Sequence, residues 1–274
     1  MSPSKKRGAY SLTSNFGLAL ITLVAQFAFA SLASATPGDL FVTDLATGSV
    51  IRYTPDGTGT TFASGLISPQ GIVFFQGNSS TTSALYVTDA GDGGATSGVV
   101  YRYDLAGNRT TFATSLDNPI GLTVDGGTIL VAENGAGRIN RLPVDGSPGT
   151  ISLLVNSPIG IDAHASGGSG FITTYIANGP SVFQVAPGGS PVDIDPGDNS
   201  RAVMVDFANN VFVTTAAGTI IEIPGNGSPK FTFVSGLNDP HGIAFVPPGV
   251  NQGQGGFVYV ADTAGSAIYK IAPG

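Results

Sequence analysis

The chain of 274 residues contains no cysteine and no tryptophan, only two histidines, and a charged fraction of just 11%. Without cysteine it can form no disulfide, and it offers no thiolate for catalysis or metal binding. It also lacks a Gly-x-Ser-x-Gly turn and a glycine-rich phosphate-binding loop that opens a helix. Nucleophilic hydrolysis and nucleotide binding therefore have no support from a motif. Long runs of helix-forming residues are missing beyond the N-terminus, which argues against a helical protein.

Positive charge is scarce as well. Eleven Lys and Arg residues stand against 18 Asp and Glu residues, which gives a formal net charge of −7. Phosphate backbones are bound by surfaces of the opposite sign. We therefore expect no nucleic acid partner.

The first 35 residues differ from the rest of the chain. A basic segment over 5–7 precedes an apolar run over 16–29, and small residues at 33–35 fit a cleavage site. This order is typical of a secretory signal peptide over 1–35, which predicts a secreted, periplasmic or cell-surface protein with no membrane span after its removal. The alternative is an uncleaved membrane anchor, because the run is near the lower length limit for a span. Removal of 1–35 leaves 8 basic and 18 acidic residues, a net charge of 8 − 18 = −10.

Forty glycines and 18 prolines accompany an apolar fraction of 42%, which indicates frequent turns around a sizeable core. One phrase, Pro-x-Gly followed by a short apolar strand, returns along the chain. Its copies begin at Pro69, Pro119, Pro158 and Pro240, with a degenerate copy at Ser200. The successive intervals are 50, 39, 42 and 40 residues, and a period in this range indicates a propeller or a solenoid.

Three further strands are predicted in each repeat. The second strand ends in a small residue and an acid, as at 40–44 and 85–89, and the third alternates before a glycine turn. The fourth is short, as in the Thr-Thr-Phe-Ala copies at 60–63 and 110–113. Four short antiparallel strands make one blade, so we predict an all-β, six-bladed β-propeller as a single domain over 36–274. Its repeats cover about 38–68, 69–118, 119–157, 158–199, 200–239 and 240–274.

The repeats resemble those of the NHL-repeat and SMP-30/gluconolactonase-like six-bladed β-propellers, the TolB-like superfamily. The likeness covers about 38–274 and lies in three segments: Pro-x-Gly-Ile, Leu-Tyr-Val-Thr-Asp and Val-Tyr-Arg-Tyr-Asp-x-x-Gly. These residues shape turns and pack blades, so the resemblance implies the fold rather than an activity.

The strand count predicts incomplete first and last blades. The first repeat begins at its second strand and the last stops after its third, which gives 22 strands rather than 24. In NHL-like propellers the N-terminus usually supplies the outer strand of the last blade, but residues 36–38 are too short for this. We therefore expect imperfect closure of the ring, or a truncated chain.

The x residues of the repeated phrase ring one mouth of the central channel in this architecture, and they are the predicted ligand-binding positions. They are Gln70, Ile120, Ile159, Arg201 and His241. The resemblance implies Asn and Asp metal ligands at such positions in SMP-30-like lactonases, and this sequence has none there. Arg201 would pair either with a carboxylate of the ligand or with nearby acids of the chain.

His241 is the candidate catalytic residue. Related propeller lyases use histidines at similar turns as metal ligands or as a base, and a general base needs only one histidine. The alternative is a histidine that hydrogen-bonds the neighbouring turn.

Acids at the ends of the second strands are candidate metal ligands. The most ligand-like set is Glu133, Asn134, Asn178 and Asp262, and the implied cofactor is a divalent metal, Ca²⁺ above all. The alternative is structural, because each acid can accept hydrogen bonds from backbone N–H groups of its turn.

These observations favour a secreted or surface module that binds a ligand or partner, with a small molecule, glycan or protein at the channel mouth of a monomer. The alternative is a metal-dependent SMP-30/gluconolactonase-like hydrolase or propeller lyase with its site in the channel. A third option is a spacer or adhesion module.

Overall fold

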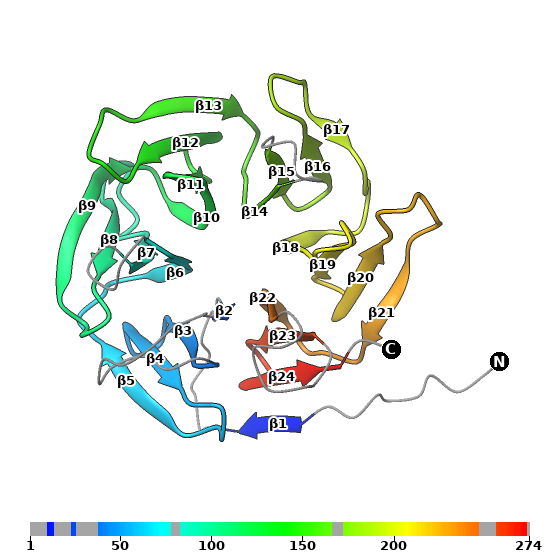
Figure 1. Cartoon of the computed structure of the whole chain (residues 1–274), viewed down its shortest axis with the longest axis horizontal. Helices are drawn as coiled ribbons and strands as arrows, with labels where there is room; N and C mark the ends of the chain where they lie inside the picture. The colour runs from blue at the N-terminus through cyan, green and yellow to red at the C-terminus, as the bar shows by residue number, and fades with distance from the viewer. Residues whose placement is uncertain are drawn as a thin grey trace.

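The computed structural model describes residues 10–13, 23–25, 38–77, 83–165, 172–246 and 256–272. They form six four-stranded antiparallel sheets, arranged as blades in a ring (Figure 1). The predicted all-β, six-bladed propeller is confirmed, and the described residues contain no helix. Accordingly, none of them forms a helix with the length and apolarity needed to cross a membrane.

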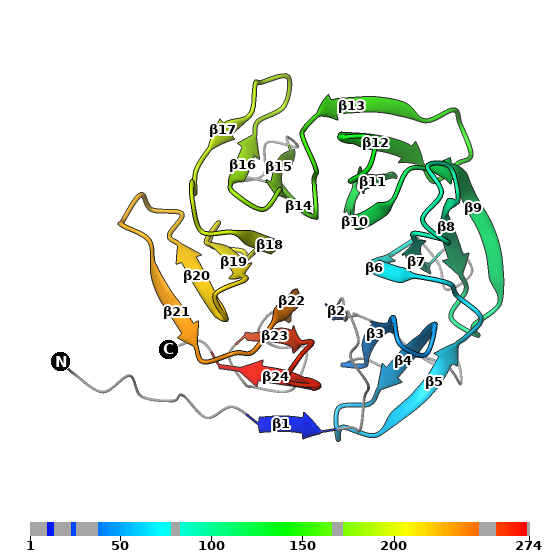
Figure 2. The same cartoon turned by 180° about the vertical axis from the view of Figure 1, so that it is seen from behind.

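Each blade is ordered from an inner strand at the channel to an outer strand at the rim (Figure 2). Blade 1 comprises β2 (Leu23–Ala25), β3 (Leu40–Asp44), β4 (Ser49–Tyr53) and β5 (Gly59–Ala63). Blade 2 comprises β6 (Pro69–Phe75), β7 (Ala84–Asp89), β8 (Gly98–Tyr103) and β9 (Arg109–Leu116). Blade 3 comprises β10 (Pro119–Asp125), β11 (Thr128–Glu133), β12 (Arg138–Pro143) and β13 (Thr150–Leu154). Blade 4 comprises β14 (Gly160–Ala165), β15 (Ile172–Ala177), β16 (Val182–Val185) and β17 (Val192–Asp193). Blade 5 comprises β18 (Ser200–Val205), β19 (Val211–Thr215), β20 (Thr219–Ile223) and β21 (Phe231–Ser235). Blade 6 comprises β22 (Pro240–Val246), β23 (Phe257–Asp262), β24 (Ala267–Ile271) and β1 (Tyr10–Thr13).

Apolar packing between neighbouring blades holds the ring together. One buried apolar cluster fills each of the six junctions. Between blades 1 and 2, for example, Phe41 packs with Ile72 and Tyr103. The second strand of a blade is covered on both faces by such clusters, and this explains why β7 and β23 are buried along their whole length. The apolar runs seen in the sequence are these strands.

The glycine of the Pro-x-Gly phrase lies where neighbouring inner strands approach most closely. A Cβ on Gly71 would lie 2.3 Å from the carbonyl oxygen of Ile120, and one on Gly121 would lie 2.5 Å from that of Ile159. A Cβ on Gly160 would meet the backbone of Ala202 at 2.7 Å. The close spacing between the blades therefore requires these glycines. Each glycine leaves room for the backbone at or next to the x residue of the next blade.

The expectation of incomplete first and last blades was wrong. Strand β1 pairs with β24 as the outer strand of blade 6, and β2 pairs with β3 as the inner strand of blade 1 (Figure 1). Both strands lie in the N-terminal segment, residues 1–35, that is predicted to be a signal peptide. The junction of blades 1 and 6 also has an apolar cluster of its own, which includes Leu40, Tyr53, Tyr259 and Ile268. The ring is therefore closed by packing as well as by these two strands.

The signal peptide over 1–35 stays a prediction, and its cleavage site at 33–35 lies outside the described residues. Removal of this segment would also remove β1 and β2, leaving 22 of the 24 strands. The outer edge of β24 and the inner edge of β3 would then lose their partners.

Substitution of Gly121 by alanine should destabilise the propeller by roughly 1–3 kcal/mol, because the new Cβ overpacks the contact between blades 3 and 4. The matched control is Gly127→Ala, where a Cβ would meet nothing within 4 Å. Urea unfolding of both variants checks this prediction. Equal stability of the two variants would contradict it.

Deletion of residues 1–35 should lower the urea midpoint and promote self-association, since it exposes two unpaired strand edges. Deletion of residues 1–9, which retains β1 and β2, is the control. Urea unfolding together with light scattering after size exclusion measures both effects. If both deletions behave like the full chain, closure does not depend on the N-terminal strands.

Candidate functional site

The five predicted x residues all line one central channel, which has a volume of about 550 Å³. Ile120, Ile159 and further residues of the inner strands β10, β14, β18 and β22 make its wall largely apolar. Gln70, Arg201 and His241 contribute polar groups near the starts of their strands. A cavity of this size and lining is typical of a small-molecule site.

Hydrogen bonds to the strand-end acids fix the backbone that leads into this mouth. The N–H groups of Ile67 and Ser68, just before Pro69, donate to Asp89 at 2.9 and 2.7 Å. In blade 6 the N–H groups of Asn238 and Asp239 donate to Asp262 in the same way, at 2.8 and 2.7 Å. The second strand of each of these blades thus orients the turn that starts its own inner strand.

A threonine one position before the last residue of the second strand fixes the x residue of the next blade, and in two of the three cases that last residue is an acid. The Oγ1 of Thr43 donates to the carbonyl of Gln70 at 2.6 Å, and that of Thr88 donates to the carbonyl of Ile120 at 2.6 Å. Thr214 donates to the carbonyl of His241 at 3.2 Å. These threonines are positioning residues that the sequence analysis missed, although the Thr-Asp endings of 43–44 and 88–89 were a visible signal.

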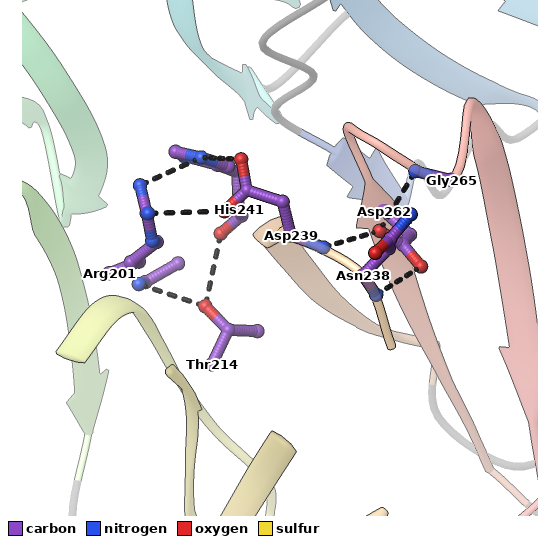
Figure 3. A network of polar contacts seen from close by, with 8 residues as sticks. Arg201, Thr214, Asn238, Asp239, His241, Asp262 and Gly265 are labelled. Atoms are coloured by element: carbon purple, nitrogen blue, oxygen red, sulfur yellow. Dashed lines mark hydrogen bonds and ion pairs between the residues drawn. The ribbon is translucent and has the colours of Figure 1, made fainter. Parts of the chain in front are cut away.

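Arg201, Asp239 and His241 form one polar cluster at the mouth (Figure 3). Arg201 Nη2 lies 3.1 Å from Asp239 Oδ1, and Arg201 Nη1 lies 2.9 Å from His241 Nε2. The acid that pairs with Arg201 is thus Asp239 of the following blade, and not an acid of the 193–198 loop. There Lys230 contacts Asp195 and Asp198 instead.

His241 Nε2 lies between a donor and an acceptor, Arg201 Nη1 at 2.9 Å and Asp239 Oδ2 at 3.2 Å. Burial and the charge of Arg201 lower the pKa of His241, which favours the neutral imidazole, while Asp239 acts in the opposite direction. The ring nitrogen that faces the channel mouth is therefore already engaged by two side chains of the chain.

The candidate metal set does not fit a shared cation site. Glu133 is fully buried, and its oxygens accept from Asp117 N–H and from Arg138. Asp262 accepts the backbone bonds described above, while Asn178 bonds to the backbone of residues 156 and 181. Of the four, only Asn134 lines the channel. No group of three His, Asp or Glu side chains in the described residues is arranged to hold a metal ion.

Two polar atoms at the mouth are buried and have no hydrogen-bond partner among the described residues. They are Oε1 of Gln70 and Nε of Arg201. An acceptor and a donor left unsatisfied in this way each cost free energy, which a bound molecule with complementary groups would offset.

The sequence analysis missed Asp162 in the channel wall. Its carboxylate accepts from Val205 N–H at 2.8 Å, from Ala163 N–H at 2.8 Å and from Thr123 Oγ1 at 3.2 Å. It therefore bridges the inner strands of blades 3, 4 and 5. The available signal was an acid at the fifth position of the repeated phrase, where the other copies have Val, Thr, Met and Ala.

Phe207 was missed as well. It occupies the turn between β18 and β19, is 69% exposed, and lines the channel. Its ring lies edge-on to Phe245 at 5.9 Å and near His164 at 6.3 Å between centroids. A phenylalanine in a turn rich in Asp and Asn was the signal in the sequence.

Asp162 should make stability depend on pH. Burial raises its pKa from 3.8 to about 6, so between about pH 4 and pH 6 the folded chain retains a proton that the unfolded chain has released. The free energy of unfolding then falls as pH rises through this window, by on the order of 3 kcal/mol. Urea unfolding at several pH values should show this slope in the wild type and not in Asp162→Asn. Parallel pH profiles would contradict the assignment.

No protein-family model and no curated protein matches the sequence. Among solved structures, a gluconolactonase from Xanthomonas campestris has a TM-score of 0.74 at 14% identity, over 98% of this chain and 90% of its own. A streptogramin B lyase has a TM-score of 0.63 at 14% identity, over 96% of both chains. A chain of a nidogen–laminin complex has a TM-score of 0.60 at 19% identity, over 83% of this chain and 91% of its own. At such identities the likeness establishes the fold alone, and the six sheets of the chain make this fold a six-bladed β-propeller.

Proposed function

We propose that this chain is a secreted or surface binding module that takes a small, mainly apolar molecule into the mouth of its central channel. The observation that carries the proposal is the pair of unsatisfied polar atoms, Gln70 Oε1 and Arg201 Nε, in an otherwise apolar channel of about 550 Å³. A molecule with one hydrogen-bond donor and one acceptor would satisfy both atoms, while its apolar body displaces water from the isoleucines.

The distribution of polar and apolar groups around the mouth supports an oriented ligand. Ile120 and Ile159 belong to blades 3 and 4, whereas Arg201 and His241 belong to blades 5 and 6. The charge of Arg201 is already balanced by Asp239. A neutral polar group is therefore a better match for this mouth than a free carboxylate, which would compete with Asp239.

The gluconolactonase and lyase likenesses make an enzyme the alternative function, with His241 as its base. The contacts of His241 Nε2 weigh against this role, because the atom is engaged by Arg201 and Asp239, and the charge of Arg201 disfavours protonation of the ring. The residues proposed as metal ligands also direct their oxygens to protein donors. Binding without chemistry is the function that the geometry supports best.

Replacement of Ile120 by tryptophan should obstruct the channel mouth and weaken binding by at least about tenfold, or ~1.4 kcal/mol. The neutral fluorescent probe N-phenylnaphthylamine reports binding by its increased emission in an apolar site. The matched control is Ile151→Trp, because Ile151 is exposed on the outer strand β13, away from the channel.

Fluorescence titration measures the affinity of the wild type, Ile120→Trp and Ile151→Trp for the probe, and thermal unfolding checks that each protein is folded. Equal affinities for the wild type and Ile120→Trp, or no emission increase with the wild type, would refute the channel as the binding site.

A further inference from the structure

We propose that the part of the channel farther from the Pro-x-Gly mouth binds an organic cation, with the ammonium group between the carboxylate of Asp162 and the rings of Phe207 and Phe245. This inference rests on the proposed binding function and names the chemical class of the ligand. The neutral polar group at the Gln70 and Arg201 mouth would then lie at the other end of the same molecule.

The first support is a carboxylate without an ion-pair partner. All three groups that donate to Asp162 are neutral: two backbone N–H groups and the hydroxyl of Thr123. In the described part of the chain, no Lys, Arg or His forms an ion pair with it, and His164 acts on it only through space. An ionised carboxylate held away from water without a paired cation is costly. A ligand ammonium would supply that partner.

The second support is the pair of aromatic rings at the far end of the inner strands. Arg201 and His241 are the second residues of β18 and β22, whereas Phe245 is near the end of β22 and Phe207 follows β18. Both phenylalanines line the same channel as Asp162. Phe207 is largely exposed although it is a large apolar side chain. Aromatic rings attract ammonium groups through their quadrupoles, most strongly where water is excluded.

The third support is the charge of the surroundings. Arg201 is the only Lys or Arg among the described residues that line the channel, and its guanidinium is bound to Asp239 and His241 at the other mouth. The whole chain carries a formal net charge of −7. These charges favour a cation over an anion near Asp162.

Three probes of nearly equal shape test the proposal by calorimetric titration: phenethylammonium, the neutral phenethyl alcohol and the anion phenylacetate. We expect the wild type at about pH 8, well above the pKa of Asp162 at about 6, to bind the ammonium at least about tenfold more tightly than the alcohol. Phenylacetate should bind most weakly. The amide resonances of Ala163 and Val205, which donate to Asp162, should shift during titration with the ammonium.

Asp162→Asn should reduce the affinity for the ammonium to that for the alcohol, without changing the affinity for the alcohol. Asp145→Asn removes the same charge from an exposed turn and should change neither the affinity for the ammonium nor that for the alcohol. Phe207→Leu retains an apolar side chain but removes the ring, and should weaken binding of the ammonium about three- to fivefold more than that of the alcohol. This variant and the wild-type preference test the proposal even if Asp162→Asn fails to fold.

Retention of the ammonium preference in Asp162→Asn, or its loss in Asp145→Asn, would overturn the assignment to Asp162. Equal binding of all three probes by the wild type would also overturn the inference, as would binding of none of them. In either case the proposed function still stands if N-phenylnaphthylamine binds and Ile120→Trp blocks it. If N-phenylnaphthylamine also fails to bind, both the cation preference and the proposed binding function are refuted.

Discussion

The close approach of neighbouring inner strands is the constraint on which the rest of the structure depends. Six blades can meet around a narrow axis only if their backbones come nearly into contact. The phrase Pro-x-Gly satisfies this requirement, because its glycine leaves room for the carbonyl of the x residue in the next blade, as Gly121 does for Ile159. The repeat that dominates the sequence is therefore a repeat of spacing, and it leaves each x side chain free to vary.

The same constraint explains how a ring of variable residues can form a defined site. In blades 2, 3 and 6 the turn before the phrase is fixed by an acid of the same blade, such as Asp89 or Asp262. The carbonyl of the x residue is fixed by a threonine of the preceding blade where one is present, as for His241. Blades that have alanine before the acid or Asn, such as those with Ala132 and Ala177, lack this second link. The most firmly placed x residues are thus Gln70, Ile120 and His241.

Much of the fold and of the channel lining could be predicted from the sequence, and the predictions that were wrong or missing have physical causes. Strands, blades and channel-lining residues followed from spacing, because the period of the repeat is a property of the backbone geometry. The strands at 10–13 and 23–25 did not, because both lie in an N-terminal segment whose basic start and apolar run are also typical of an export signal. Asp162 and Phe207 were missed for another reason. Each lies in a single copy of the repeat and departs from its consensus, so the pattern that the copies share does not indicate it.

The charged groups that line the channel thereby differ along its axis rather than only around the ring. At the Pro-x-Gly mouth the charges are balanced within the protein, because Arg201 is paired with Asp239 and lowers the pKa of His241. Farther along the channel Asp162 has only neutral hydrogen-bond donors and lines the same cavity as two phenylalanine rings. A structure that neutralises one end and leaves a single charge at the other is suited to hold an elongated ligand in one direction. The shared propeller fold alone does not provide that polarity, since it arises from residues that depart from the repeat.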